Sequence, residues 1–115
     1  MEDTLFDKII RREIPADILY EDDEVMVLRD IHPVAPVHVL IIPKCPIESI
    51  AKMEDKDALL VGRMHLVARD IAVKLGVAET GYRLVTNSGD NSGREVKYLH
   101  LHLIGGKFLG SKIVA

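Results

Sequence analysis

The chain has 115 residues, enough for one domain with its own core, and its 48% hydrophobic and 29% charged residues are typical of globular proteins. Its formal charge of −3, with acidic and basic residues interspersed, excludes the basic surface that attracts nucleic acid. Cys45 is the single cysteine, no apolar stretch approaches the roughly 18 residues of a membrane span, and the start Met1-Glu2-Asp3 is unlike a signal peptide, so we expect a cytoplasmic protein.

The first half of the chain is expected to form one short helix and three strands. Thr4, or Asp3 before it, has a side-chain oxygen that can cap a helix, and Pro15 ends that helix because a residue before proline avoids helical conformation. Asp22-Asp23 lies between two strand-like runs and predicts a hairpin. The expected elements are a helix from Asp3 or Thr4 to about Arg11 and strands over residues 17–21, 25–29 and 37–42.

The second half is expected to form one long helix and two strands. Over residues 56–75 the apolar residues recur at helical spacing in two adjacent stripes, and Gly76 is placed to end the helix. The stripes are Leu60, Met64, Val67, Ile71 and Leu75, and beside them Val61, His65, Ala68 and Ala72. This apolar arc is wider than packing against one sheet requires. Strands are expected over residues 82–86 and 96–104, separated by a loop rich in turn residues.

Together these elements predict a single α+β domain over residues 1–115, with a five-stranded antiparallel sheet, one main helix and a short N-terminal helix. Successive residues of a strand point to opposite faces of a sheet. In the last expected strand, Tyr98, His100 and His102 therefore share one face and the intervening leucines share the other. Leucines suit a core, whereas two imidazoles in line with a phenol, next to Gly105-Gly106, indicate a site.

The two histidines leave three interpretations open: a structural pair, two ligands of a zinc site, or catalytic groups. A zinc site needs three or four ligands, and the nearest candidates are His38, His32 and Cys45. His38 lies near the start of the third expected strand, which can bring it beside His100 and favours catalysis. His65, within the apolar arc, is expected to be a packing or interface residue.

The loop before the last strand favours phosphate binding. Gly89 and Gly93 permit positive φ and close approach of the backbone to a ligand, and amides after such a bend can bind an anion. Asn87 ends the preceding strand, where its amide can reach a ligand; a tight turn in solvent is the alternative. An imidazole nucleophile beside phosphate-binding amides suffices for nucleotidyl transfer. Asp30, which ends the second strand, can bind a sugar diol or be a solvated acid.

In these motifs the chain resembles the histidine triad family, specifically its Hint branch of purine nucleoside phosphoramidases. The order and spacing of the similar segments agree over nearly the whole chain. These segments are residues 3–10, 13–16, 20–23, 30–38, 42–44, 81–87 and 100–106. The resemblance implies a homodimer in which the main helices pack together and the sheet continues across the two-fold axis, which would account for the wide apolar arc.

The resemblance also implies an activity. The family's nucleophile, its middle triad histidine, falls on His100, and its attack on the α-phosphorus would give a nucleotidyl-histidine that water cleaves to a nucleoside monophosphate. Substrates would be adenosine or guanosine 5'-phosphoramidates and similar adenylated compounds, cleaved at the P–N or a related P–O bond. The third triad histidine falls on His102 and the upstream histidine on His38; both would contact phosphate oxygens or the leaving group. No metal or other cofactor is required, which fits a site without a carboxylate cluster for Mg²⁺.

The nucleotide-binding residues follow from the same resemblance. Asn87 and the backbone amides near Gly93, Glu95 and Val96 would hold the phosphate region, and Asp30 would bind the ribose hydroxyls. The purine slot would be lined by Leu5, Phe6, Ile9, Ile14, Leu28 and Ile31. The implied partners are a purine nucleotide and a second copy of the chain, with neither nucleic acid nor a membrane.

Three positions depart from the family's pattern. Tyr98 replaces the first triad histidine, although the family uses the main-chain carbonyl there, which a tyrosine also supplies. Arg94 stands where glutamine is common and can contact an anionic substrate or point to solvent, and Glu95 replaces a small hydroxyl residue of some members. Because of Tyr98, a purine-nucleotide-binding regulatory module with weak catalysis is the alternative function. A zinc-binding module is a third, and a dinucleoside polyphosphate hydrolase is an alternative within the enzymes.

Overall fold

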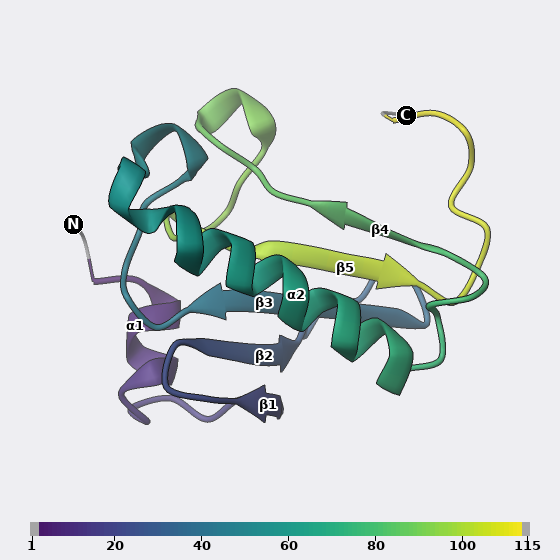
Figure 1. Ribbon diagram of the computed structural model, residues 1–115, viewed down its shortest axis with the longest axis horizontal. Helices are drawn as coiled ribbons and strands as arrows, with labels where there is room; N and C mark the ends of the chain where they lie inside the picture. Colours follow the sequence, from purple (N-terminus) through teal and green to yellow (C-terminus); the bar gives the residue numbers. More distant parts are fainter. Residues whose placement is uncertain (1–2, 114–115) are drawn as a thin grey trace.

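The computed structural model describes residues 3–113, so Met1 and Glu2, which belong to the acidic start, lie outside the described residues. Over residues 3–113 the chain forms a five-stranded antiparallel sheet in the order β1-β2-β3-β5-β4, with two α-helices and three 3-10 helices (Figure 1). The strands are β1 (Ile18–Glu21), β2 (Val25–Arg29), β3 (Val37–Pro43), β4 (Tyr82–Val85) and β5 (Leu101–Gly105). The helices are α1 (Leu5–Ile10), α2 (Ala58–Lys74), η1 (Ile50–Lys52), η2 (Asp55–Asp57) and η3 (Asp90–Ser92). The predicted α+β class is confirmed.

Helix α1 begins where the sequence predicts, because Thr4 and Asp7 form a capping box. Asp7 N–H donates to Thr4 Oγ1 at 3.4 Å, and Thr4 N–H donates to Asp7 Oδ2 at 2.7 Å. Phe6 and Ile9 are the buried residues of this helix. For the part of the chain that is described, neither helix has both the length and the apolar content that a membrane crossing needs.

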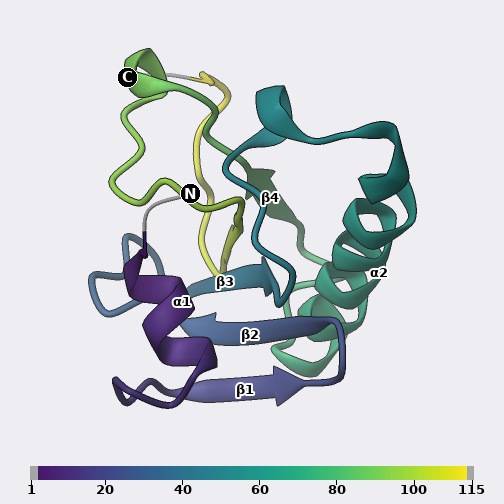
Figure 2. The same ribbon diagram turned by 90° about the vertical axis from the view of Figure 1, so that its left-hand side faces the viewer.

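The two α-helices pack on opposite faces of the sheet (Figure 2). Alternate strand residues face α2, and these are Val25, Val27, Val39, Ile41, Leu101 and Leu103. The residues between them face α1, and these are Met26, Leu28, Leu40 and Ile42. His38 and His102 share the register of this second face. With six residues α1 is about 9 Å long, whereas five strands span about 19 Å, so α1 covers part of the face that carries the histidines.

The last strand is shorter than the sequence predicts. A strand was expected over residues 96–104, but β5 begins at Leu101, and the described residues 96–100 form no strand. Ile41 of β3 pairs with Leu101, so the ladder would next reach Pro43, which has no N–H to donate. The Leu99 N–H donates instead to the Ile47 carbonyl at 2.6 Å. The predicted alternation still holds, because Leu99 is buried on the α2 side and Tyr98 on the α1 side.

Helix α2 is confirmed, although its first turn is the separate helix η2, and its apolar arc divides differently from the expected stripes. Its side against the sheet buries Met64, Val67, Ala68, Ile71 and Ala72. His65 was expected to be a packing or interface residue; packing within this chain is wrong, because His65 is exposed and its Nδ1 donates to the Val61 carbonyl at 2.8 Å, and an interface role stays a prediction. The exposed apolar residues are Leu59 (89%), Leu66 (46%) and Val73 (65%), each seven residues from the next. These three lie on one line of the helix.

Candidate functional site

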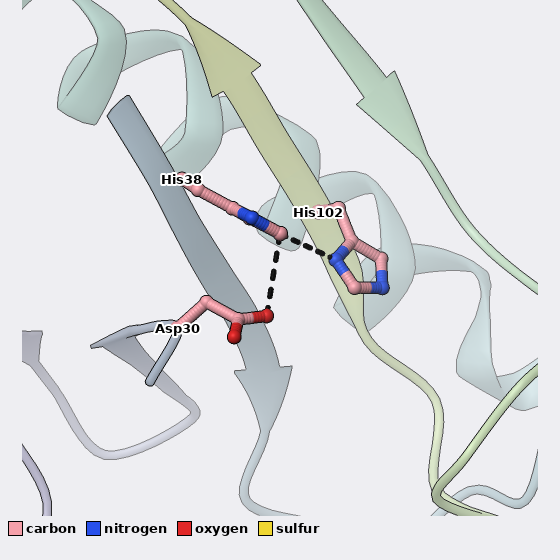
Figure 3. A group of neighbouring side chains, drawn as sticks. All are labelled: Asp30, His38 and His102. Atoms are coloured by element: carbon pink, nitrogen blue, oxygen red, sulfur yellow. Dashed lines mark hydrogen bonds and ion pairs between the residues drawn. The ribbon is translucent and has the colours of Figure 1, made fainter. Parts of the chain in front are cut away.

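The neighbouring strands β2, β3 and β5 bring Asp30, His38 and His102 together (Figure 3). His38 lies on β3 and His102 on β5, where Leu40 of β3 is the register partner of His102. Asp30 directly follows β2, and its N–H donates to the His38 carbonyl at 3.1 Å. His38 Nε2 lies 2.9 Å from His102 Nδ1 and 3.3 Å from Asp30 Oδ2. The strand register therefore assembles residues that are far apart in the sequence.

The hydrogen bonds of His38 define the tautomers of both imidazoles. The Val34 N–H donates to His38 Nδ1 at 3.1 Å, so this nitrogen carries a lone pair and the ring is neutral. The hydrogen of His38 is then on Nε2, which donates to His102 Nδ1 and faces Asp30 Oδ2. Because His102 Nδ1 accepts, the hydrogen of a neutral His102 is on Nε2, which is left as a donor.

His100 has the complementary tautomer. Its Nδ1 donates to the Tyr98 carbonyl at 2.6 Å, which leaves an unprotonated Nε2. The His100 ring lies edge-on to Phe6 at a centroid distance of 5.1 Å, and its centroid is 4.9 Å from that of His102. The sequence placed His38 beside His100, whereas the nitrogen contact of His38 is with His102, which lies between the two. The site thus presents a free nitrogen lone pair on His100 and an N–H on His102, on two neighbouring imidazole rings.

Burial keeps His100 and His102 neutral. It lowers the pKa of His100, because the protonated ring would lose its hydration, and this outweighs the Tyr98 carbonyl, which acts in the opposite direction. Burial, followed by the nearby His100 and His38, lowers the pKa of His102 to about 4. At neutral pH both rings are therefore uncharged, in agreement with the tautomers that the hydrogen bonds require.

Tyr98, which stands where the family has its first triad histidine, is buried and fixes the backbone next to His100. Its side chain is 1% exposed and packs edge-on against Phe6 at 5.7 Å. Its hydroxyl donates to the Pro43 carbonyl at 2.5 Å, at the end of β3. Its own carbonyl is the acceptor for His100 Nδ1. The phenol therefore connects the end of β3 to the backbone group that orients the imidazole.

The loop between β4 and β5 has the positive φ angles that were expected at its glycines. Gly89 and Gly93 both have positive φ, +83° and +85°, and lie on either side of η3. Asn87 is half-buried and follows Val85, the register partner of His102, by two residues. Continuing that register places Asn87 level with His100.

The three residues after Gly93 differ in their environment. Glu95 is exposed, and Val96 packs against the cluster under α1. The Arg94 side chain is 9% exposed, so of the two expectations for this residue, pointing to solvent is wrong.

The residues expected to line a purine slot are divided between the core and the surface. Phe6, Ile9 and Leu28 are buried in the cluster under α1, and Ile14 packs against it. Leu5 is 42% exposed and Ile31 is 80% exposed. The structure therefore brings four of the six together and leaves Leu5 and Ile31 open to a ligand.

The sequence did not identify two contacts of this site. One is the Val34 N–H, whose signal is the rigid connection between Pro33 and Pro36 that holds this backbone near His38. The other is the contact of Asp30 with His38, because Asp30 was expected to bind ribose. Both depend on distances across the sheet, which local sequence patterns do not encode.

Asp30, His38 and His102 also offer ligand atoms of the types that zinc binds, all within 4.8 Å of one another. Two nitrogens bound to one tetrahedral zinc at 2.0–2.1 Å would be roughly 3.3 Å apart, and both would be unprotonated. His38 Nε2 and His102 Nδ1 are 2.9 Å apart, and the proton between them forms a hydrogen bond. Zinc would therefore have to displace that proton.

Comparisons with known proteins agree with this fold. A model of the HIT domain matches residues 11–109. The chain is 50% identical over 109 residues to the purine nucleoside phosphoramidase of Escherichia coli, covering 95% of this chain and 92% of that protein. A HIT family hydrolase from Clostridium thermocellum has a TM-score of 0.95 and 46% identity over 99% of both chains. A histidine triad protein from Clostridium difficile has a TM-score of 0.92 and 41% identity, covering 97% of this chain and 99% of that one.

Proposed function

Because this chain belongs to the HIT-domain family and is a nucleotide hydrolase, we propose that it cleaves the P–N bond, or a related P–O bond, of adenosine or guanosine 5'-phosphoramidates and similar adenylated compounds. The observation that carries the proposal is the tautomer of His100. Its Nδ1–H is held by the Tyr98 carbonyl, so its Nε2 lone pair is free to attack phosphorus. The relative from Escherichia coli is named for the same class of substrate.

The proposed reaction has two displacements at phosphorus. His100 Nε2 forms a bond to the α-phosphorus as the P–N bond of the substrate breaks, and the leaving nitrogen takes up a proton from solvent water and departs as an amine. A water molecule then attacks phosphorus, the bond to Nε2 breaks, and the attacking water releases a proton to solvent, so the protons balance over the two steps. The product is a nucleoside monophosphate. In the intermediate the imidazole is cationic, and the Tyr98 carbonyl stabilises the hydrogen on its Nδ1.

In this scheme His102, His38 and Asp30 orient the phosphate. His102 Nε2–H donates to a phosphate oxygen, since His102 Nδ1 is occupied by His38. Asp30 Oδ1 accepts from the His32 N–H at 2.8 Å and Oδ2 faces His38, yet a carboxylate has about four acceptor positions, so Asp30 also has lone pairs for the ribose hydroxyls. Loss of His38 or His102 is expected to slow turnover by roughly 10²–10⁴-fold.

The remaining ligand contacts are those that the resemblance implies. Asn87 and the amides near Gly93, Glu95 and Val96 bind the phosphate region, and the cluster around Phe6 with Leu5 and Ile31 receives the purine. The active form is a homodimer whose α2 helices pack through Leu59, Leu66 and Val73, which are exposed in a single chain.

The proposal is tested by incubating metal-free protein with adenosine 5'-phosphoramidate in the presence of a chelator and following AMP release. We expect turnover by the parent and none by His100→Ala, whose fold and AMP affinity stay close to those of the parent because the lost group acts on the transition state. His32→Ala is the matched control, because His32 is exposed and only its backbone contacts Asp30. Turnover by His100→Ala near the parent rate would exclude the covalent mechanism, and turnover that requires added zinc would favour the metal alternative.

A further inference from the structure

Arg94 carries a positive charge that is largely removed from water. Its side chain is 9% exposed, and within residues 3–113 its Nε and Nη1 have no hydrogen-bond partner. Nη2 lies 3.7 Å from Asp90 Oδ1, which is too long for a hydrogen bond, and the Asp90 side chain is 90% exposed. A buried guanidinium whose donors lack acceptors costs free energy, so such a group calls for a specific explanation.

The position of Arg94 relates this unused charge to the proposed reaction. Arg94 directly follows Gly93, about midway along the segment between β4 and β5. Figure 1 shows this segment leaving the sheet at β4. Across the sheet, Asp30 follows β2, His38 lies on β3 and His102 on β5, and β4 is the next strand beyond β5. Arg94 also lies two residues before Val96, which packs against the cluster of Phe6 and Tyr98. The Phe6 ring lies against His100, so the Arg94 loop borders the proposed nucleophile.

We propose that Arg94 recognises an anionic group on the leaving side of the scissile bond. This inference rests on the proposed function and specifies its substrate class: nucleoside phosphoramidates whose departing amine carries a carboxylate, as an amino acid does when it is linked through its nitrogen. A guanidinium matches a carboxylate with two parallel N–H donors.

The guanidinium is free to turn toward such an anion. Since Nε and Nη1 are without acceptors among the described residues, no hydrogen bond from either has to be broken when the side chain turns about its own bonds. The loop is loosely packed where it bends, because a Cβ added at Gly89 or Gly93 would meet no described atom within 4 Å.

The test compares two substrates that differ by one charge: AMP joined through its phosphoramidate nitrogen to glycine or to glycinamide. For the parent we expect kcat/KM to favour the glycine compound by about tenfold or more, as a charge-assisted hydrogen bond provides. In Arg94→Gln the ratio of the two kcat/KM values is expected to fall toward the ratio of the two uncatalysed hydrolysis rates. Lys97→Gln is the matched control, because Lys97 is exposed, lies three residues away and loses the same charge, and it is expected to keep the parent ratio.

Equal ratios in the parent and in Arg94→Gln would overturn this inference while leaving the proposed function intact. Absence of turnover with both compounds and with adenosine 5'-phosphoramidate would contradict the proposed function instead. Calorimetry still tests Arg94 in that case, because Arg94→Gln must weaken binding of the glycine compound more than binding of the glycinamide compound. Arg94→Gln is also expected to keep the melting temperature. A lower melting temperature with an unchanged ratio would assign Arg94 to structure and refute its role in recognition.

Discussion

At His100, burial and hydrogen bonding act in opposite directions on the imidazole. Burial lowers its pKa, whereas the Tyr98 carbonyl favours the protonated ring, and burial prevails. The carbonyl nevertheless decides which nitrogen holds the remaining hydrogen. The result is a neutral imidazole whose free lone pair is on Nε2. The Tyr98 side chain affects His100 only indirectly, by holding in place the backbone whose carbonyl orients the imidazole.

The first prediction therefore concerns Tyr98. Tyr98→His keeps the carbonyl, so catalytic efficiency is expected to change by less than about tenfold, or 1.4 kcal/mol. Tyr98→Phe removes the hydroxyl and leaves the buried Pro43 carbonyl without its donor, which is expected to lower the free energy of unfolding by about 1–2 kcal/mol. Single-turnover rates, calorimetric AMP affinities and urea unfolding of the three proteins measure these effects.

A large gain in single-turnover rate for Tyr98→His, with AMP affinity unchanged, would contradict this view of Tyr98. The first triad imidazole would then be needed to organise the site. That result would favour the nucleotide-binding module with weak catalysis over an enzyme.

The second prediction is a pH dependence of stability caused by His102. Its pKa is about 4 in the folded protein and about 6.5 in the unfolded chain, so the unfolded chain binds more protons between these values. The contribution of His102 is present above pH 6.5 and is lost as the pH falls toward 4. Between pH 7 and pH 5 the free energy of unfolding is expected to fall by about 2 kcal/mol from this residue.

Urea unfolding at pH 7 and pH 5 measures this effect, and His102→Gln is expected to lose the corresponding part of the pH dependence. His32→Gln is the control, because His32 is exposed. His38, His100 and Asp30 surround His102 and remain in both proteins. Equal pH dependence in the parent and in His102→Gln would show that His102 is not held neutral.

At the scale of single elements, two sides of helix α2 have different roles. Met64 and Ala68 are fully buried against the sheet, so they stabilise the single chain. Leu59, Leu66 and Val73 are exposed on another line of the helix and match a partner that packs along it. The residues of the two expected stripes, except His65, pack in the core of the single chain. The residues assigned to the proposed dimer lie outside both stripes.

The third prediction follows from this division. Leu66→Glu is expected to shift the protein from dimer to monomer in analytical ultracentrifugation while its circular dichroism stays close to that of the parent. Met64→Glu is expected to unfold the chain, because it places an unpaired charge in the core. Ala78→Glu, an exposed position after the helix, is the control for the added charge. A folded monomer at micromolar concentration for the parent would contradict the dimer.

The elements also show which parts of the fold can be predicted from sequence. Strands β1 to β4, both helices and the side of each residue from Tyr98 to Leu103 follow from local periodicity. The late start of β5 does not, because it depends on Pro43 of another strand. The His38–His102 contact likewise depends on register across the sheet, and the burial of Arg94 on how its loop folds back.

For the whole molecule, one face of the sheet contributes most of the apolar core and the other face carries the residues of the proposed reaction. Its α2 face buries the larger apolar cluster, and its α1 face carries His38, His100, His102 and Tyr98. The strand order then arranges the proposed contacts in sequence across the sheet, with Asp30 after β2, the histidines on β3 and β5, and the Arg94 loop after β4. A rigid sheet can hold such groups at fixed distances, which is what a displacement at phosphorus requires.

The central claim is that His100 Nε2 becomes bonded to phosphorus. The most direct measurement mixes metal-free protein with a stoichiometric amount of adenosine 5'-phosphoramidate, quenches with denaturant at alkaline pH, where a phosphorus–histidine bond survives, and determines the mass of the protein and of its peptides. We expect a transient mass increase of one adenylyl group, located on the peptide that contains His100 and missing in His100→Ala. Release of AMP by the parent without any such adduct, or an adduct on another residue, would contradict the account.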